Sequence, residues 1–352
     1  MIVSNGLTRD GNPASNDYKI QLDNLVKTCS KYESVIGYDF KDEPSWSSLP
    51  DLKKRYDLFQ QILHKYNRKQ FLFLNIVGVE ENSTFNPKMK YAAYVNYIAE
   101  MFHPNQLSID FYPILRNPGE KHFNIKYKMF YRDLSDLAAM REKYGIPFWS
   151  YCMSMEHITE GGHYQPRPTE GHLRFEAYSA LAYGAQGLLY WTYSQRPSNA
   201  SETYISAPIN LKGKKTRTWN RVRNVNREIR AYNSVFFNAV PLKCVHTGEV
   251  AAKIQPKGYT AEDITKENLP EVKITSQKDG VLISHLKNGD KRFIVMANQN
   301  PFKSQKINFS LPKGFNYKEY IANNGRLKIS DISASQLSRR LKAGGILVLE
   351  YY

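Results

Sequence analysis

The sequence predicts an α/β protein: a (β/α)8 barrel of the TIM type that lacks its first two β/α units, followed by a C-terminal antiparallel β-sandwich. Apolar, β-prone runs alternate with helical patterns over residues 1–240. No glycine-rich phosphate loop follows any of these runs, which disfavours the doubly wound open sheet as the alternative architecture. Short runs of period-two character separated by turns occupy residues 241–352.

Six strands are expected in the barrel region. The run at 71–79 is almost continuously apolar, as expected for a strand that is buried on both faces. A closed barrel needs eight strands, so aligning the chain by its last long helix leaves the first two units missing and makes the N-terminus incomplete. The predicted strands are 1–4, 35–40, 71–79, 107–114, 147–155 and 187–193.

Helical patterns separate these strands. In the second of them, Leu52, Tyr56 and Phe59 recur at spacings of three and four residues and define one apolar face. Gly145 is a stop signal after the fourth helix, and Thr169 is suited to cap the fifth. The predicted helices are 18–32, 49–67, 87–103, 126–144, 169–182 and 216–240.

The domain boundary is expected near residue 240, with a barrel domain at 1–240 and a β-sandwich domain at 241–352. Turn signals such as Lys278-Asp-Gly280 separate the short strands of the second domain. These strands are predicted at 272–276, 280–286, 292–298, 305–311, 317–322 and 346–351.

The composition of the chain limits the classes of protein to which it can belong. With 41% hydrophobic and 13% aromatic residues, the chain of 352 residues can form a packed core. Cys29, Cys152 and Cys244 are odd in number and far apart, so neither a disulfide framework nor a metal site is expected, and no cofactor is predicted. No apolar run is long enough to span a membrane. No export signal is visible, and a periplasmic or extracellular location is expected if a missing N-terminus carried one.

The net charge of +16 leaves three classes of partner to consider: a nucleic acid, an anionic membrane and an acidic polysaccharide. Most Lys and Arg residues are scattered, which is typical of a solvated basic surface. The dense exception is residues 212–230. No nucleic-acid recognition element is visible, so nucleic acid is disfavoured and an acidic or sulfated glycan stays open.

Polar and aromatic residues stand at the C-terminal ends of the predicted strands. In a (β/α)8 barrel these ends meet at one face, where the loops build the active site. The segment Ser34-Val-Ile-Gly-Tyr-Asp-Phe-Lys-Asp-Glu-Pro44 is the most informative, because a β-prone run stops on two carboxylates close to Trp46. The candidate site residues are Asp42, Glu43, Trp46, Asn75, Asp110, Tyr112, Glu156 and Trp191.

If the first two strands are missing, Glu43 ends strand four and Glu156 ends strand seven. Glycoside hydrolysis commonly uses two carboxyl groups that face each other across the scissile bond. One of them protonates the leaving oxygen, and the other attacks the anomeric carbon or activates a water molecule. An aromatic plane beside them, such as Trp191 or Trp46, can carry a sugar ring.

The sequence resembles the large clan of retaining glycoside hydrolases built on (β/α)8 barrels, in particular its beta-galactosidase-like and cellulase-like members. In that clan the acid/base Glu ends strand four and the nucleophilic Glu ends strand seven. Asp42-Glu43-Pro44 matches the first motif, Ser154-Met-Glu156-His the second by position, and Trp191 the stacking aromatic of strand eight. The resemblance implies Glu43 as acid/base and Glu156 as nucleophile. Asp42 stands where the clan normally has Asn.

Each of these residues can also be explained by a structural role, without catalysis or substrate binding. Glu43 is placed to open the following helix, Glu156 to be a solvated loop carboxylate, and Asp110 to cap a turn. Trp46 and Tyr112 can be core residues. The predicted function is therefore a retaining glycosidase, with a non-catalytic carbohydrate-binding barrel as the alternative.

Overall fold

The computed structural model describes residues 1–66, 69–78, 90–254, 258–262 and 267–352. The chain forms two compact units. The first consists of Met1–Asp110 and Met140–Trp149, and the second of Phe111–Ala139 and Ser150–Tyr352. Helix α5 (Tyr127–Tyr144) and strand β7 (Phe148–Met153) contribute residues to both units.

Parallel strands form the sheet of the first unit. They lie in the order β1-β2-β3-β4, so each strand pairs with the next one along the chain. Helices separate consecutive strands, as the alternating pattern predicts. The strands are β1 (Ile2–Val3), β2 (Gly37–Asp42), β3 (Phe71–Val77) and β4 (Leu107–Asp110).

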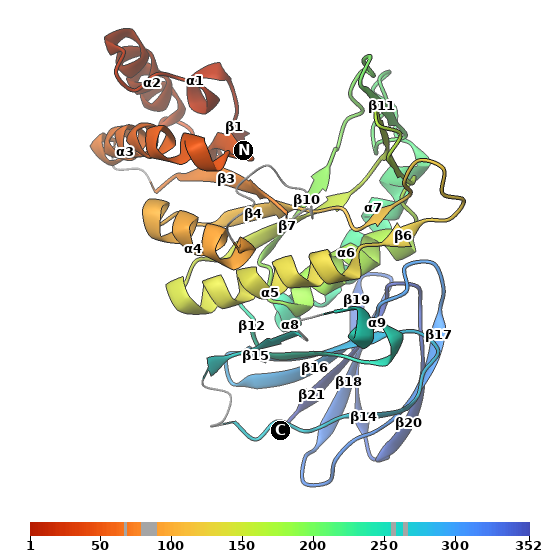
Figure 1. Cartoon of the computed structure of the whole chain (residues 1–352). Coiled ribbons are helices and arrows are strands. Elements are labelled where there is room, and N and C mark those ends of the chain that lie inside the picture. The colour runs from red at the N-terminus through yellow and green to blue at the C-terminus, as the bar shows by residue number, and fades with distance from the viewer. Residues whose placement is uncertain (67–68, 79–89, 255–257, 263–266) are drawn as a thin grey trace. The chain divides into compact units, whose positions relative to one another are not determined.

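The helices of this unit, drawn in red to orange in Figure 1, bury their apolar faces in its core. Phe59 packs its ring 5.1 Å from that of Tyr38 in β2, which ties the predicted apolar stripe of the second long helix to the sheet. The helices are α1 (Gly6–Arg9), α2 (Asn16–Cys29), α3 (Leu49–Lys65) and α4 (Tyr91–Phe102), with the 3-10 helix η1 (Trp46–Ser48) before α3.

In the second unit, the end of β7 lies beside β10 (Gly187–Trp191). The backbone N–H of Ser154 donates to the Trp191 carbonyl at 2.8 Å. Helix α6 (Glu170–Ala182) precedes β10, and every residue from Gly171 to Ala182 is buried. A helix that is buried all round must pack on several elements, and α6 contacts both helix α7 (Arg217–Ala231) and the C-terminal sheets.

The C-terminal β-domain has two antiparallel sheets. Seven strands pair in the order β13-β12-β15-β16-β21-β18-β19, and three in the order β14-β17-β20. Their bounds are β12 (Val240–His246), β13 (Gly258–Thr260), β14 (Lys273–Ser276), β15 (Val281–Asn288), β16 (Lys291–Asn298), β17 (Gln305–Ser310), β18 (Tyr317–Asn323), β19 (Arg326–Ile332), β20 (Gln336–Leu341) and β21 (Ile346–Tyr351). Helix α9 (Gly248–Lys253) follows β12.

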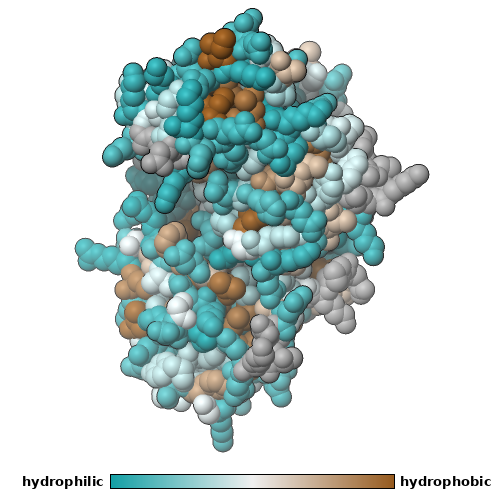
Figure 2. Space-filling model, turned by 90° about the vertical axis from the view of Figure 1, so that its left-hand side faces the viewer, coloured by the Kyte–Doolittle hydropathy of each residue, from teal (hydrophilic) through white to brown (hydrophobic). Residues whose placement is uncertain are grey.

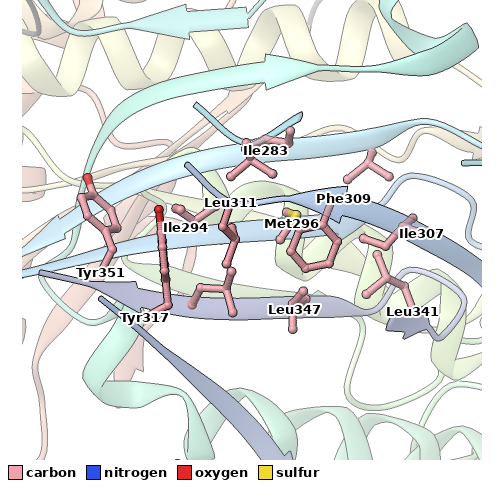
Figure 3. Close-up of a cluster of buried hydrophobic side chains, with 13 residues drawn as sticks. Ile283, Ile294, Met296, Ile307, Phe309, Leu311, Tyr317, Leu341, Leu347 and Tyr351 are labelled. Carbon is pink, nitrogen blue, oxygen red and sulfur yellow. The ribbon is translucent and has the colours of Figure 1, made fainter. Parts of the chain in front are cut away.

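Side chains from both sheets of the β-domain share one core (Figure 3). Ile294 and Met296 of β16 and Leu347 of β21 come from the larger sheet, and Ile307 and Phe309 of β17 come from the smaller one. Buried and less buried residues alternate along β17, so one face of the smaller sheet lies in the core, as the period-two pattern predicts. In contrast, β16 and β21 of the larger sheet are buried over most of their length on both faces.

A second core joins this domain to the helices of the same unit. Tyr178 and Leu181 of α6, with Phe236 of α8 (Asn233–Phe236), pack against Phe293 and Val348 of the larger sheet. The predicted helix 216–240 therefore needs correction: α7 ends at Ala231, and residues 240–246 form a strand.

Each of the six strands predicted for residues 1–240 has a counterpart in the structure, and parallel pairing joins β1 to β4. Residue 67 of the second predicted helix, residue 79 of the third predicted strand and residues 87–89 of the third predicted helix lie outside the described residues. The chain is an α/β protein with parallel strands followed by several antiparallel sheets, which is consistent with part of a TIM barrel plus a β-domain. The boundary at residues 240/241 remains a prediction.

Figure 2 shows a face on which hydrophilic residues predominate and hydrophobic residues gather in small separate spots. Scattered exposed apolar residues of this kind are usual on folded proteins. Within the described residues, none of the helices combines the length and the apolar character that a membrane crossing requires.

Candidate active site

Three neighbouring parallel strands of the first unit carry polar residues at or near their C-terminal ends, and their register brings these residues together. Asp42 of β2 is aligned with Asn75 of β3, and Asn75 is in turn aligned with Ser108 of β4. The Asn75 amide donates to Asp42 Oδ1 at 2.9 Å, and the Ser108 hydroxyl donates to Asn75 Oδ1 at 2.7 Å. Asn75 is buried, so this chain of hydrogen bonds holds Asp42 in one orientation.

Glu43 follows directly after β2, and its backbone is locked onto the next strand. Its N–H donates to the Asn75 carbonyl at 2.9 Å. The residue has φ of 44°, in the left-handed region that non-glycine residues rarely adopt. Such backbone strain costs on the order of 1–3 kcal/mol and is concentrated at functional sites. The strain is consistent with selection for the direction of the Glu43 side chain.

Asp110, the last residue of β4, completes a group of three carboxyl groups. Burial raises the pKa of Asp110 well above its usual range, and the charges of Glu43 and Asp42 raise it further. Hydrogen bonding with Glu43 acts in the same direction, while a hydrogen bond from Asn75 opposes it. The side chains of Asp42, Glu43, Asn75 and Asp110 therefore form one cluster, as their places at the strand ends predicted.

An arginine and a tyrosine border this cluster. Arg9 of α1 lies 3.5 Å from Asp42 Oδ2 and 3.6 Å from Asp39 Oδ2, so its charge is divided between two carboxylates. The Tyr94 hydroxyl of α4 donates to the Pro44 carbonyl at 3.0 Å. Burial raises the pKa of Tyr94 above its usual range, and the charge of Glu43 adds to this effect.

Trp46 lies in η1, three residues after Glu43, and is half-buried. Its ring centroid is 4.5 Å from that of Tyr97 and 6.5 Å from that of Tyr94, both on α4. One side of the indole is therefore supported by other aromatic rings. This position fits either a core contact or a sugar platform that is held at a fixed angle.

Glu156 lies in the second unit, in the small antiparallel sheet β11-β8-β9. Its carboxylate accepts a hydrogen bond from the Tyr164 hydroxyl at 2.8 Å and is paired with Arg167 through contacts of 3.1 and 3.2 Å. The sequence placed Glu156 directly after strand 147–155, whereas β7 ends at Met153 and Glu156 begins a new strand. The three strands are β8 (Glu156–Thr159), β9 (Tyr164–Gln165) and β11 (Glu202–Ile205).

Trp191 and Tyr112 meet in a different part of the second unit. Both pack on a small buried cluster made by Met153, Met155 and Tyr204, together with Ala207. His157 is aligned with Tyr204 in the small sheet and stacks on it. Because successive strand residues point to opposite faces, Glu156 lies on the face of this sheet opposite to Tyr204.

Several residues around these groups were missed by the sequence reading, above all Arg9, Tyr164 and Arg167. The pair Gly161-Gly162 between two β-prone runs is a hairpin signal that could have placed Tyr164 beside Glu156. A further short antiparallel pair, β5 (Ile114–Leu115) with β6 (Asn124–Ile125), was also missed.

Glu176 is the other unexpected carboxyl group. It lies in the middle of α6 and is 2% exposed. It accepts a hydrogen bond from the Met153 backbone N–H at 2.7 Å. Burial raises the pKa of Glu176 to about 8. Its carboxyl group thus supports the end of β7 in a largely neutral form at pH 7.

Chemically, the arrangement can move protons and bind hydroxyl groups. Within the described ranges, no group of three or more His, Cys, Asp or Glu side chains is arranged to hold a metal ion. The carboxyl cluster of the first unit offers acidic and basic oxygens side by side. The Glu156 group of the second unit offers a carboxylate stabilised by a cation.

Comparison with known proteins gives a family match. Residues 48–232 match the model of glycoside hydrolase family 42, described as beta-galactosidase. The matched segment begins after Glu43 and includes Glu156 and Trp191. A search of curated proteins found no match.

Solved structures with a similar fold include glycoside hydrolases. The beta-galactosidase from Bacillus circulans sp. alkalophilus is 10% identical, with a TM-score of 0.56 over 97% of this chain and 83% of that chain. An alpha-amylase from H. orenii is 12% identical, with a TM-score of 0.45 over 96% of this chain and 65% of that chain. A beta-galactosidase from Halorubrum lacusprofundi is 11% identical, with a TM-score of 0.43 over 96% and 83%. Similarity to the first of these structures, the Bacillus circulans enzyme, is evidence for the fold of this chain and for nothing beyond the fold.

Replacing Glu176 with Gln is expected to change how stability depends on pH. Because the folded protein keeps the Glu176 proton up to about pH 8 while the unfolded chain releases it near pH 4.5, wild-type stability falls between these values. Glu176→Gln lacks this loss, and the difference should grow in its favour by roughly 1.4 kcal/mol per pH unit at most. Urea unfolding at pH 5 to 8 measures it.

The exposed Glu271→Gln variant is the matched control and should follow the wild-type curve. Parallel curves for Glu176→Gln and wild type would show that Glu176 is already ionised in the folded protein at pH 5.

Proposed function

Because this chain belongs to the beta-galactosidase family of glycoside hydrolases and is a glycosidase, we propose that it cleaves O-glycosidic bonds of an oligo- or polysaccharide by the retaining mechanism. Glu43 is the acid/base in this proposal, and Glu156 is the nucleophile. The observation that carries it is the carboxyl cluster at the ends of β2, β3 and β4, in which Glu43 is held in a strained backbone conformation.

The cluster supplies what an acid/base residue needs. Glu43 is exposed, so a glycosidic oxygen can reach it. Its neighbour Asp42 is fixed by Asn75 and Arg9, which suits a residue that orients sugar hydroxyl groups. Glu43 would protonate the leaving oxygen as the glycosidic bond breaks, and would later remove a proton from the attacking water.

The surroundings of Glu156 support its role as nucleophile. A nucleophilic carboxylate must be ionised, and both the Arg167 cation and the Tyr164 hydroxyl stabilise the charged form. The Glu156 side chain is only 14% exposed, so these contacts are only partly screened by water. Trp46, Trp191 and Tyr112 are the aromatic surfaces proposed to bind sugar rings.

We also propose that the glycan carries negative charge. Residues 212–230 present eight cations: Lys212, Lys214, Lys215, Arg217, Arg221, Arg223, Arg227 and Arg230. In the described part of the chain, no acidic side chain forms an ion pair with any of them. Two of these cations lie close to the Trp219 ring: Lys215 Nζ is 3.9 Å and Arg223 Cζ is 5.0 Å from the ring centroid. A sulfated or carboxylated glycan matches this combination of charge and aromatic surface.

Replacing Glu43 with Gln tests the acid/base role. The variant should fold normally but lose about 10²–10⁴-fold in kcat/KM on glycosides with poor leaving groups. The loss should be much smaller on dinitrophenyl glycosides, because their leaving groups need no proton. The exposed Glu33→Gln variant, from the loop before β2, is the control and should keep full activity. Equal losses on both substrates would contradict the acid/base role.

Replacing Glu156 with Gly tests the nucleophile. The variant should be inactive on both kinds of substrate, and added azide should restore turnover of an activated glycoside with a glycosyl azide of inverted configuration as the product. Glu160→Gln, an exposed change in the same hairpin, should behave as wild type. Near-normal hydrolysis by Glu156→Gly would assign the attacking carboxylate to another residue.

Removing the cations of residues 212–215 tests the charge of the glycan. The triple variant with Lys212, Lys214 and Lys215 changed to Ser should elute from immobilised dextran sulfate at clearly lower salt than wild type. A control with Lys306, Lys313 and Lys328 changed to Ser loses the same charge elsewhere and should elute later than the first variant. Identical elution of the two variants, or tighter binding to duplex DNA than to dextran sulfate, would contradict the proposal.

A further inference from the structure

The surroundings of Asp110 favour its neutral form, although a hydrogen bond from Asn75 acts in the opposite direction. Its Oδ1 atom is buried and accepts no hydrogen bond from any described residue. An ionised carboxylate normally has donors at both oxygens, and leaving one of them without a partner away from water costs several kcal/mol. Protonated Asp110 avoids this cost, because a neutral carboxyl group does not require a hydrogen-bond donor at each of its lone pairs, whereas the carboxylate does.

The charges around Asp110 act in the same direction. Asp42 and Glu43 come from the end of β2, and both disfavour a second negative charge close to them. Arg9 of α1, the cation that borders this cluster, is already shared between Asp39 and Asp42. Tyr94 of α4 interacts with Glu43, and burial keeps its hydroxyl group neutral. From β3 the neighbour is Asn75, which has no charge.

Asp110 and Glu43 also lie close enough for their carboxyl groups to interact directly. Two carboxyl groups in contact cannot both be ionised without strong repulsion, so such a pair holds one proton over a wide pH range. The burial of Asp110 Oδ1 and the exposure of Glu43 make the two members unequal. The less exposed member keeps the proton, and the exposed one faces the substrate.

We propose that Asp110 and Glu43 share one proton, and that Asp110 is the positioning residue that keeps this proton available for the acid/base step of Glu43. This inference rests on the proposed function. When the glycosidic C–O bond breaks, the shared proton goes to the leaving oxygen and both carboxyl groups are ionised. Their repulsion makes Glu43 a stronger base for the second step, in which the attacking water returns one proton to the pair.

The protonation of Asp110 can be tested without any substrate. Infrared spectra separate neutral carboxyl groups from carboxylates, and the wild-type protein at pH 7 should show a neutral carboxyl signal that Asp110→Asn lacks. Glu176→Gln identifies the signal of the other raised carboxyl group. In Glu43→Gln, the Asp110 signal should disappear at a pH lower by about one unit or more, because the neighbouring negative charge is gone.

Kinetics provide the second measurement. The Asn side chain in Asp110→Asn can still donate a hydrogen bond to Glu43, so the geometry is kept while the exchangeable proton is lost. The alkaline limb of the kcat/KM profile should then move to lower pH by about one unit, because Glu43 no longer has an acidic neighbour. A merely structural role of Asp110 would lower activity equally at all pH values.

The outcomes separate this inference from the proposed function. If the wild-type protein hydrolyses no glycoside but the Asp110 signal behaves as described, the proposed function is contradicted. The inference that Asp110 and Glu43 share one proton is then still supported. If hydrolysis depends on Glu43 but Asp110→Asn keeps both the neutral carboxyl signal and the wild-type pH profile, the shared proton is overturned alone. Circular dichroism of each variant checks that it is folded.

Discussion

The parallel pairing of β2, β3 and β4 is the constraint on which the candidate site depends. Its register aligns Asp42 with Asn75 and Asn75 with Ser108, so three loops begin at the same edge of one sheet. The backbone bond from Glu43 to Asn75 extends this pairing by one residue beyond the strand. A slip of one residue in either pair would turn the alternate side chains to the other face and separate the carboxyl groups.

Buried polar groups then give the carboxyl groups different properties. Asn75 and Ser108 supply hydrogen bonds to one side of the cluster, whereas Asp110 Oδ1 has no donor among the described residues. Similar side chains therefore differ in their affinity for a proton according to their neighbours, as paired carboxyl groups in enzymes often do. In the second unit, the neighbours of Glu176 likewise determine its affinity for a proton. Its buried carboxyl group accepts a hydrogen bond from the end of β7.

Prediction from the sequence was most accurate for the elements that have a long and regular pattern of apolar residues. The helix around Phe59 and strand β17 of the β-domain follow their periodicity closely. Prediction failed where the segments are short or polar. The strands at 326–332 and 336–341 carry few apolar residues, and the hairpin of Glu156 and Tyr164 is set by a Gly-Gly turn. Such strands are stabilised by pairing with a partner that is remote in sequence, which local patterns do not reveal.

The sequence by itself indicated which residues lie near the C-terminal ends of the parallel strands, because alternating β and α patterns and a few turn residues mark those regions, although the predicted strand ends at 40, 79 and 114 differ from the observed ends of β2, β3 and β4. This placed Asp42, Glu43, Asn75 and Asp110 in one group before any coordinates. Only the tertiary structure decided how these side chains differ: which oxygen has a donor, which is buried, and that Arg9 binds Asp42 while Arg167 binds Glu156. The physical reason is that proton affinity depends on distances of a few ångströms and on burial, and both arise from segments far apart in the chain.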